Sequence, residues 1–334
     1  MPDNNLDGAT GQTQGERQSA VPGSDPGTSD SGTIDPGFRR GVIIATLTYM
    51  AWGFAPIYFK LLADVTPFLV IAQRSIWVAV FLLIGMGVTG RTHLFLAVLR
   101  DPRTLAKLSL SGLLLAANWT GFFYAVATGR VLDSSLAYFI TPLMAVLFGT
   151  MILREKLRLW QWISVATATL GVLITLFESG VSIGFLPIFL ALSWAFYGMV
   201  RKFTQVDAFT GLLVESLVMA PLGIAFSFYL EFSGGMKLET LSIHTWILLV
   251  NTATITIFPL IGFAIATRLL TFSLLGLMNY ISPFLQFLCA VVLFGEALNW
   301  VRLSSFAVIW LSLVIIAIDG WIHTRRQKHA ASSV

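Results

Sequence analysis

The sequence predicts an all-α membrane protein with ten transmembrane helices, arranged as two inverted five-helix repeats. Three observations predict this fold: the composition, a series of apolar stretches about 20 residues long, and an internal repeat with an offset of 141 residues. Of the 334 residues, 56% are hydrophobic and 11% are charged, and the mean hydropathy is +0.80. Soluble domains carry about 25% charged residues. A water-soluble fold could not bury this much apolar side-chain surface.

Ten apolar stretches follow one another from Gly41 onward. Each is long enough, as a helix, to cross a hydrocarbon core of about 30 Å. Helices are expected because lipid offers no hydrogen-bond partners to backbone N–H and C=O groups, which a helix satisfies internally. The alternating apolar and polar pattern of barrel strands is absent from the sequence. The predicted spans are 41–60, 68–89, 105–127, 132–153, 159–177, 182–200, 209–230, 245–266, 272–294 and 301–321.

Outside the spans, the sequence indicates polar tails at residues 1–38 and 325–334. The first is rich in Gly, Ser, Thr, Asp and Pro and has too little apolar surface to fold, so we expect a disordered cytoplasmic tail. It lacks the pattern of a secretory signal peptide. Cys289, the only cysteine, lies in an apolar run, which excludes an intrachain disulfide and a cysteine-based metal cluster. We expect it to be buried, and we expect no cofactor.

The distribution of Lys and Arg predicts the orientation of the spans. With the amino terminus inside, sixteen of these residues fall on the cytoplasmic side and four, Lys60, Arg130, Lys237 and Arg302, on the other. Cytoplasmic loops carry such an excess, so both termini are expected in the cytoplasm. The net charge of +4 is spread between apolar runs and forms no patch for nucleic acid.

The repeat divides the chain into halves at 39–180 and 181–324. Tyr138-Phe139-Ile140-Thr141-Pro142 recurs as Asn279-Tyr280-Ile281-Ser282-Pro283, and a glutamate follows thirteen residues after each proline, Glu155 and Glu296. Trp52 likewise corresponds to Trp194, and Arg74 to Glu215. Because each half holds five spans, the second enters the membrane in the opposite sense. Inverted repeats are typical of secondary transporters, whose solute site lies near the bilayer midplane.

Four residues are predicted to lie near that midplane: Trp52, Trp194, Pro142 and Pro283, each ten to twelve residues into its span. Paired helix interruptions are the best sequence indication of a transporter site, although proline also merely kinks membrane helices. The tryptophans lie too deep to be interfacial anchors, so they either pack the bundle or line a cavity.

Arg74 and Glu215 are the costliest residues to place in a membrane, at about 2.5–3.5 kcal/mol for a central charge. The functional interpretation is that Arg74 binds an anionic or polar group and that Glu215 binds a cation or a proton, which would couple transport to protons. Alternatively, each snorkels to an interface or pairs with backbone carbonyls. If the helices are upright, the two differ in depth by roughly 12 Å, so a direct salt bridge between them is not required.

Further polar residues are predicted at matching depths: Asn118 and Tyr138 near Arg74, and Asn279 and Tyr280 near Glu215. They either contact a solute or make interhelical hydrogen bonds. Glu155 and Glu296 lie at helix ends, where a capping role is favoured over contact with the solute.

Several segments together resemble the RarD subgroup of the EamA permeases, within the drug/metabolite transporter superfamily. The resemblance runs from about Arg39 to Arg326 and is carried by Trp52–Lys60, Arg74–Trp77, Ala117–Trp119, Ser134–Pro142, Phe196–Lys202 and Ala266–Arg268. One departure is Arg154 before Glu155, where the family commonly has glycine.

This resemblance implies ten helices in two EamA repeats, a bacterial cytoplasmic (inner) membrane and a transport role. Its motifs also add Tyr58, Trp119 and Tyr197 to the residues expected at the solute site. Members of the subgroup carry the label "chloramphenicol-sensitive protein", but the resemblance defines no physiological solute.

The expected function is therefore a secondary transporter for a small organic metabolite or drug-like solute, with its cavity among spans 1–4 and 6–9. No Walker motif is present, so ATP is not expected as the energy source. An intramembrane enzyme is disfavoured because no His-Glu-x-x-His or Gly-x-Ser-x-Gly motif occurs and all four histidines lie in loops or tails. A lipid-handling or accessory membrane protein without solute flux is the remaining alternative. The sequence leaves the oligomeric state open.

Overall fold

The computed structural model describes residues 36–128, 130–179, 184–233, 238–295 and 300–332, and within these ranges the chain is all-helical. The helices are α1 (Pro36–Lys60), α2 (Pro67–Thr89), α3 (Thr92–Arg100), α4 (Pro102–Ala127), α5 (Val131–Met151), α6 (Leu159–Ser179), α7 (Phe185–Phe203), α8 (Ala208–Phe232), η1 (Leu238–Thr240), α9 (Ile243–Leu269), α10 (Phe272–Met278), α11 (Ile281–Leu288), η2 (Cys289–Leu293) and α12 (Trp300–Ser332).

Every predicted span coincides with a helix or, for 272–294, with a run of three helical pieces. Six of these segments are long and apolar enough to cross a membrane: α1, α2, α6, α8, α9 and the run Phe272–Leu293. The stretches Leu136–Met151 and Phe306–Gly320 are shorter apolar helices. The protein is therefore a helical membrane protein with several spans. The short helix α3 was not predicted.

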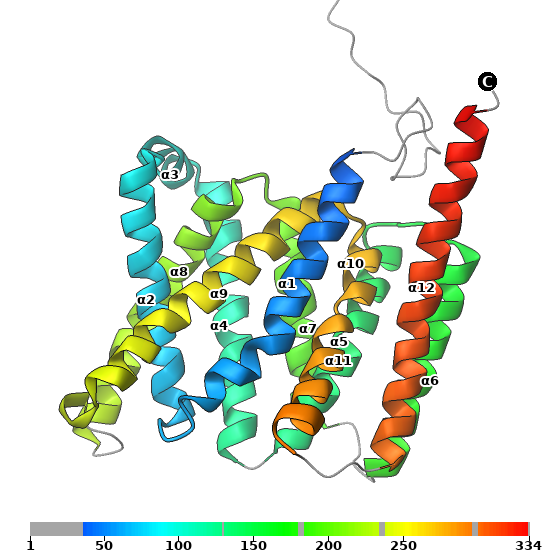
Figure 1. Ribbon diagram of the computed structural model, residues 1–334. Helices are drawn as coiled ribbons and strands as arrows, with labels where there is room; N and C mark the ends of the chain where they lie inside the picture. The colour runs from blue at the N-terminus through cyan, green and yellow to red at the C-terminus, as the bar shows by residue number, and fades with distance from the viewer. Residues whose placement is uncertain (1–35, 129, 180–183, 234–237, 296–299, 333–334) are drawn as a thin grey trace, which may run out of the picture.

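The helix ends differ from the prediction in both terminal regions. The first helix starts at Pro36, inside the predicted tail 1–38, and the rest of that tail lies outside the described residues. At the other end, α12 continues to Ser332, through most of the predicted tail 325–334. Lys, Arg, Gln and Ala are good helix formers, so the helix continues past the apolar span. The start of α1 and the end of α12 lie at the same end of the bundle (Figure 1).

The run 272–293 is interrupted, whereas its counterpart in the first half is continuous. A break at Asn279 and Tyr280 separates α10 from α11, and the π-helical turn η2 follows. Pro283 has no N–H to donate to an earlier carbonyl but is tolerated in the first turn of a new helix, so α11 begins just before it. Pro142, in contrast, lies inside the unbroken helix α5.

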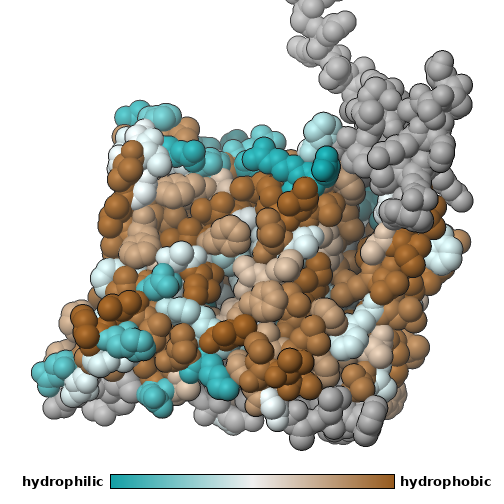
Figure 2. Space-filling view, in the orientation of Figure 1, coloured by the Kyte–Doolittle hydropathy of each residue, from teal (hydrophilic) through white to brown (hydrophobic). Residues whose placement is uncertain are grey.

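Packing is organised by a few close helix pairs. Helix α1 packs against α9 and α11, α2 against α8 and α9, α4 against α7 and α8, and α5 against α7 and α10. Helices α6 and α12 form a pair at one edge of the bundle (Figure 1). The flank of the molecule is largely apolar, and hydrophilic residues gather at its upper rim (Figure 2). Large exposed side chains, such as Phe177 and Phe232, each 85% exposed, suit contact with lipid.

The loop after α5 shows the local effect of the missing glycine. Arg154 has a φ of 54°, and Gly295, its counterpart in the repeat, has a φ of 69°. The left-handed region costs an L-residue with a side chain roughly 1–2 kcal/mol. The first half therefore adopts at Arg154 the backbone conformation for which the second half uses glycine.

Candidate functional site

The guanidinium of Arg74 lies over an aromatic ring between two helices. Arg74 is seven residues after the start of α2, and Trp119 is eight residues before the end of α4. The Cζ atom of Arg74 is 3.6 Å from the centroid of the Trp119 ring, well inside the range of a cation–π interaction. The Nε atom of Arg74 is buried and makes no hydrogen bond. Two residues that were predicted separately thus form one unit.

Tyr138 adds an aromatic wall close to this cation. It is seven residues after the start of α5, in the neighbourhood of Arg74. Its side chain is 38% exposed, and its ring packs edge-on against Phe122, with centroids 6.0 Å apart. Asn118 instead donates to the hydroxyl of Ser193 at 2.9 Å and to a backbone carbonyl of α7 at 2.8 Å. These contacts match the interhelical interpretation of Asn118.

Trp52 and Trp194, both predicted near the bilayer midplane, lie in contact with each other. Their rings are 5.3 Å apart at 78°, and each also contacts Phe263, at 6.0 Å and 5.3 Å. Tyr197 completes the group: it lies 5.3 Å from Trp194 and stacks on Phe263 at 14°. The two tryptophans stay partly exposed, whereas Tyr197 is fully buried. The cluster thus combines packing with a partly accessible aromatic surface.

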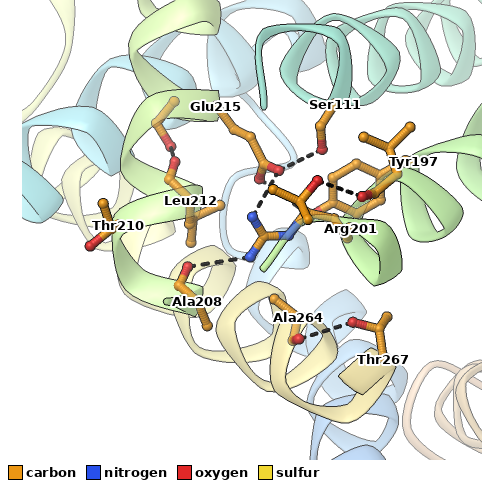
Figure 3. A network of polar contacts seen from close by, with 12 residues as sticks. Ser111, Tyr197, Arg201, Ala208, Thr210, Leu212, Glu215, Ala264 and Thr267 are labelled. Atoms are coloured by element: carbon orange, nitrogen blue, oxygen red, sulfur yellow. Dashed lines mark hydrogen bonds and ion pairs between the residues drawn. The ribbon is translucent and has the colours of Figure 1, made fainter. Parts of the chain in front are cut away.

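Glu215, in the second turn of α8, lies in a buried polar network that shares Tyr197 with the aromatic cluster (Figure 3). Its carboxylate is 3.3 Å from Nη1 of Arg201, and both side chains are buried. Ser111 donates to Oε1 at 2.5 Å, and the hydroxyl of Tyr197 lies 3.5 Å from Oε2. A methyl group on Gly211 would collide with the guanidinium of Arg201, so glycine makes room for this pair. Glu215 exposes no surface to a solute here.

The end of the bundle where α7 ends is closed by contacts between the two predicted halves. Glu155 accepts hydrogen bonds from the backbone N–H groups of Phe272, at 2.6 Å, and Ser273, at 2.8 Å, at the start of α10. Lys202 donates to two carbonyls near the end of α9 and lies 3.9 Å from Glu155. Glu155 therefore has the predicted capping role, and it caps a helix of the other half. Glu296 lies outside the described residues.

The remaining predicted residues are spread over helix contacts. Tyr58, near the end of α1, donates to a carbonyl of α9 at 2.6 Å, and Tyr280 donates to a carbonyl of α5 at 3.0 Å. Asn279 ends α10, Pro283 is buried in α11 and Pro142 is buried in α5. Within the described part of the chain, no hydrogen bond, ion pair or ring contact joins these five residues to Arg74.

Sequence reasoning missed Arg201 and Ser111, the partners of Glu215. Arg201 was assigned to a cytoplasmic loop, but it lies in the last turn of α7 and is only 2% exposed. The sequence did contain an indication that Arg201 faces the bundle. Arg201 follows Tyr197 by four residues, so in a helix the two side chains share one face. Both point toward Glu215 (Figure 3).

Two hollows adjoin the helices of this site. A void of about 10 Å³ beside Trp119, bordered also by Ser75, Leu115 and Met219, has room for about one water molecule. On another face of α4, an apolar groove of about 710 Å³ runs between α4, α7 and α8 and includes Thr120 and Phe189. Neither hollow is lined by Arg74 or Tyr138.

Comparison with known proteins agrees with this architecture. Residues 39–177 match the model of the EamA-like transporter family. The chain is 37% identical over 292 residues to an uncharacterized transporter of Pseudomonas aeruginosa, covering 86% of this chain and 96% of that protein. It is 37% identical over 290 residues to the protein RarD of Salmonella typhi, covering 87% and 98%. A protein of known crystal structure, 20% identical, superposes with a TM-score of 0.64 over 82% of this chain and 96% of its own, which supports the fold alone.

The helical bundle and these relatives define a multi-pass membrane transporter. Its relatives are bacterial, and it is a protein of the bacterial inner membrane. More specifically, the chain belongs to the EamA family and is RarD-like.

Proposed function

We propose that this protein is a secondary transporter that moves a small organic metabolite or drug-like solute across the cytoplasmic membrane by alternating access. Ten spans form two inverted halves, 39–180 and 181–324, and both termini are cytoplasmic. The observation that carries the proposal is the cation–π pair of Arg74 and Trp119, a charged group that stays partly accessible inside a membrane bundle. Intramembrane charges that face protein or water commonly mark a solute pathway.

The packing of the helices supports an inverted repeat. If the 141-residue offset is applied, α1 corresponds to α7 and α4 to α9, and α1 packs on α9 as α7 packs on α4. Helix α2 corresponds to α8, and these two pack on each other, as do α6 and α12. Such a pattern is expected of two halves related by a pseudo-two-fold axis in the membrane plane.

Individual residues near this axis support the same relation. Trp52 contacts Trp194, its own counterpart, at 5.3 Å. The hydroxyl of Tyr280 donates to the carbonyl of Phe139, again its counterpart, at 3.0 Å. Equivalent residues meet each other only close to a symmetry axis. The aromatic cluster would therefore lie where the two halves meet, which is where solutes bind in repeat-built transporters.

The contacts of Glu155 support alternating access. They join the first half to the start of α10 at the end of the bundle where α7 ends, which is cytoplasmic in the predicted orientation. Lys60 and Glu296 are the repeat counterparts of Lys202 and Glu155. In the state open to the cytoplasm, the Glu155 contacts would be broken, and Lys60 and Glu296 would make the equivalent contacts at the opposite end of the bundle.

The test is a comparison of metabolites exported by cells with and without the protein, followed by uptake into proteoliposomes of any solute that changes. Flux that depends on the protein and falls in the Arg74→Gln variant supports the proposal. Absence of flux across a broad metabolite panel would refute it. That outcome would favour the lipid-handling alternative, for which the open apolar groove beside α4 is the relevant surface.

A further inference from the structure

We propose that the solute is a planar, aromatic organic anion whose carboxylate binds Arg74. This inference rests on the proposed transport function and names the class of solute. It follows from the charge balance of the bundle, from the orientation of the guanidinium and from the side chains around it.

The charge balance leaves Arg74 without an acidic partner. The other strongly buried charges are paired: Glu215 with Arg201 at 3.3 Å, and Asp319 with Arg158 at 2.6 Å. Among the described residues no carboxylate forms an ion pair with Arg74. The interior near Arg74 therefore carries one positive charge that a bound anion would neutralise.

The orientation of the guanidinium suits a carboxylate. With Cζ 3.6 Å from the ring centroid, Trp119 covers one face of the group. The N–H groups lie in the guanidinium plane, so stacking leaves them free to donate at the edge. The Nε atom, buried and without a hydrogen bond, is one of the two donors that commonly form a fork to a carboxylate. A bound carboxylate would both accept a hydrogen bond from this Nε–H group and neutralise the charge of the guanidinium.

The neighbouring side chains favour an aromatic body on the anion. Tyr138, in the neighbourhood of the cation, is 38% exposed. The ring of Phe122 packs against the ring of Tyr138 with an interplanar angle of 70°. Aromatic rings prefer edge-on or offset contacts with other rings. Asn118, the polar residue next to Trp119 on α4, already donates two hydrogen bonds to α7 through its amide nitrogen. Recognition therefore combines one charged fork with aromatic walls.

The experiment measures equilibrium binding of three indole probes to the purified full-length protein in detergent. Indole-3-acetate is the anion, indole-3-acetamide its neutral match and tryptamine the cation. We expect indole-3-acetate to bind at least about tenfold tighter than the other two, the effect of a charge-assisted hydrogen bond. Arg74→Gln should remove this preference, and Trp119→Leu should weaken binding of the anion. Arg100→Gln, which removes an exposed arginine at the end of α3, is the matched control and should leave the preference intact.

A second variant covers the case in which Arg74→Gln does not fold. Arg74→Lys keeps the charge but loses the fork. It should bind indole-3-acetate several-fold more weakly than the wild type while its affinity for the amide stays unchanged.

Three results would overturn the inference: no binding of indole-3-acetate to the wild type, equal binding of the amide or the amine, or an unchanged preference in both Arg74 variants. Solute flux with any of these results would leave the transporter proposal standing. Anion binding without flux of any solute would count against transport alone.

Discussion

Replacing Arg201 by methionine should destabilise the protein strongly, because Glu215 would then be a buried charge without a counterion. Glu215 and Arg201 are 0% and 2% exposed, and the carboxylate keeps only the hydroxyls of Ser111 and Tyr197 when the guanidinium is gone. Breaking a buried pair in this way typically costs about 3–5 kcal/mol. For a chain of this size, that corresponds to a fall in Tm of roughly 4–7 °C.

The single cysteine provides the assay. Cys289 is 2% exposed, so a thiol-reactive fluorogenic dye reports its exposure as the detergent-purified protein melts. The double variant Arg201→Met with Glu215→Met should recover most of the loss, since both charges are removed together. Arg91→Met is the matched control: this arginine pairs with Asp207 at 3.5 Å but is 45% exposed, so its loss should cost at most about 1 kcal/mol.

Additivity would refute this reasoning. If the double variant loses as much stability as the sum of Arg201→Met and Glu215→Met, the two charges are not coupled. A control variant that melts as low as Arg201→Met would show that removal of any arginine, not burial of the pair, is responsible.

Three further predictions concern the backbone and the contacts of Glu155. Gly53→Ala should lower stability by about 1–3 kcal/mol, because its Cβ would lie 2.6 Å from a side chain of α11, whereas Gly87→Ala, with nothing within 4 Å, should not. Arg154→Gly should raise the Tm by a few degrees, about 1 kcal/mol, because glycine adopts a φ of 54° without strain. Glu155→Gln should weaken the cap of α10, so that a cysteine at Thr271, in a cysteine-free background, reacts several-fold faster with a membrane-impermeant maleimide added from the cytoplasmic side.

Each of these predictions has a result that contradicts it. Equal melting of Gly53→Ala and Gly87→Ala would mean that α1 and α11 separate easily. A lower Tm for Arg154→Gly would mean that the arginine side chain stabilises its loop by more than the backbone conformation costs. Unchanged labelling at Thr271 in the Glu155→Gln variant would mean that the remaining contacts hold this end closed.

The positions of the helices could be predicted from the sequence because hydropathy depends on local runs of residues. All ten predicted ranges coincide with helical segments, and the largest differences lie at the two ends of the chain. The sequence predicted an interruption or a kink at both Pro142 and Pro283, which occupy equivalent places in the repeat, but only Pro283 lies next to a break in its span. That difference depends on tertiary contacts, which override local propensity.

The candidate site was predicted residue by residue but not as contacts. Sequence identified Arg74 and Trp119 without indicating that one stacks on the other. It also placed Arg201 in a loop, because the count of loop charges treats every arginine near a helix end as solvated. Whether such a side chain turns outward or toward Glu215 depends on the neighbouring helices. Charge pairing inside a bundle is therefore the part of the site that a single sequence predicts least well.

The break after Asn279 has a consequence for how this span exchanges its amide protons. The broken region is held from two sides, since Tyr280 donates to a carbonyl of α5 and Ser282 to the carbonyl of Tyr49 at 2.9 Å. The pieces on either side are short, seven residues in α10 and eight in α11. Each can therefore fray or tilt without the other, and deuterium uptake should rise separately at the two ends of this one span. A solute that stabilises only one of the two pieces would then lower deuterium uptake in that piece alone.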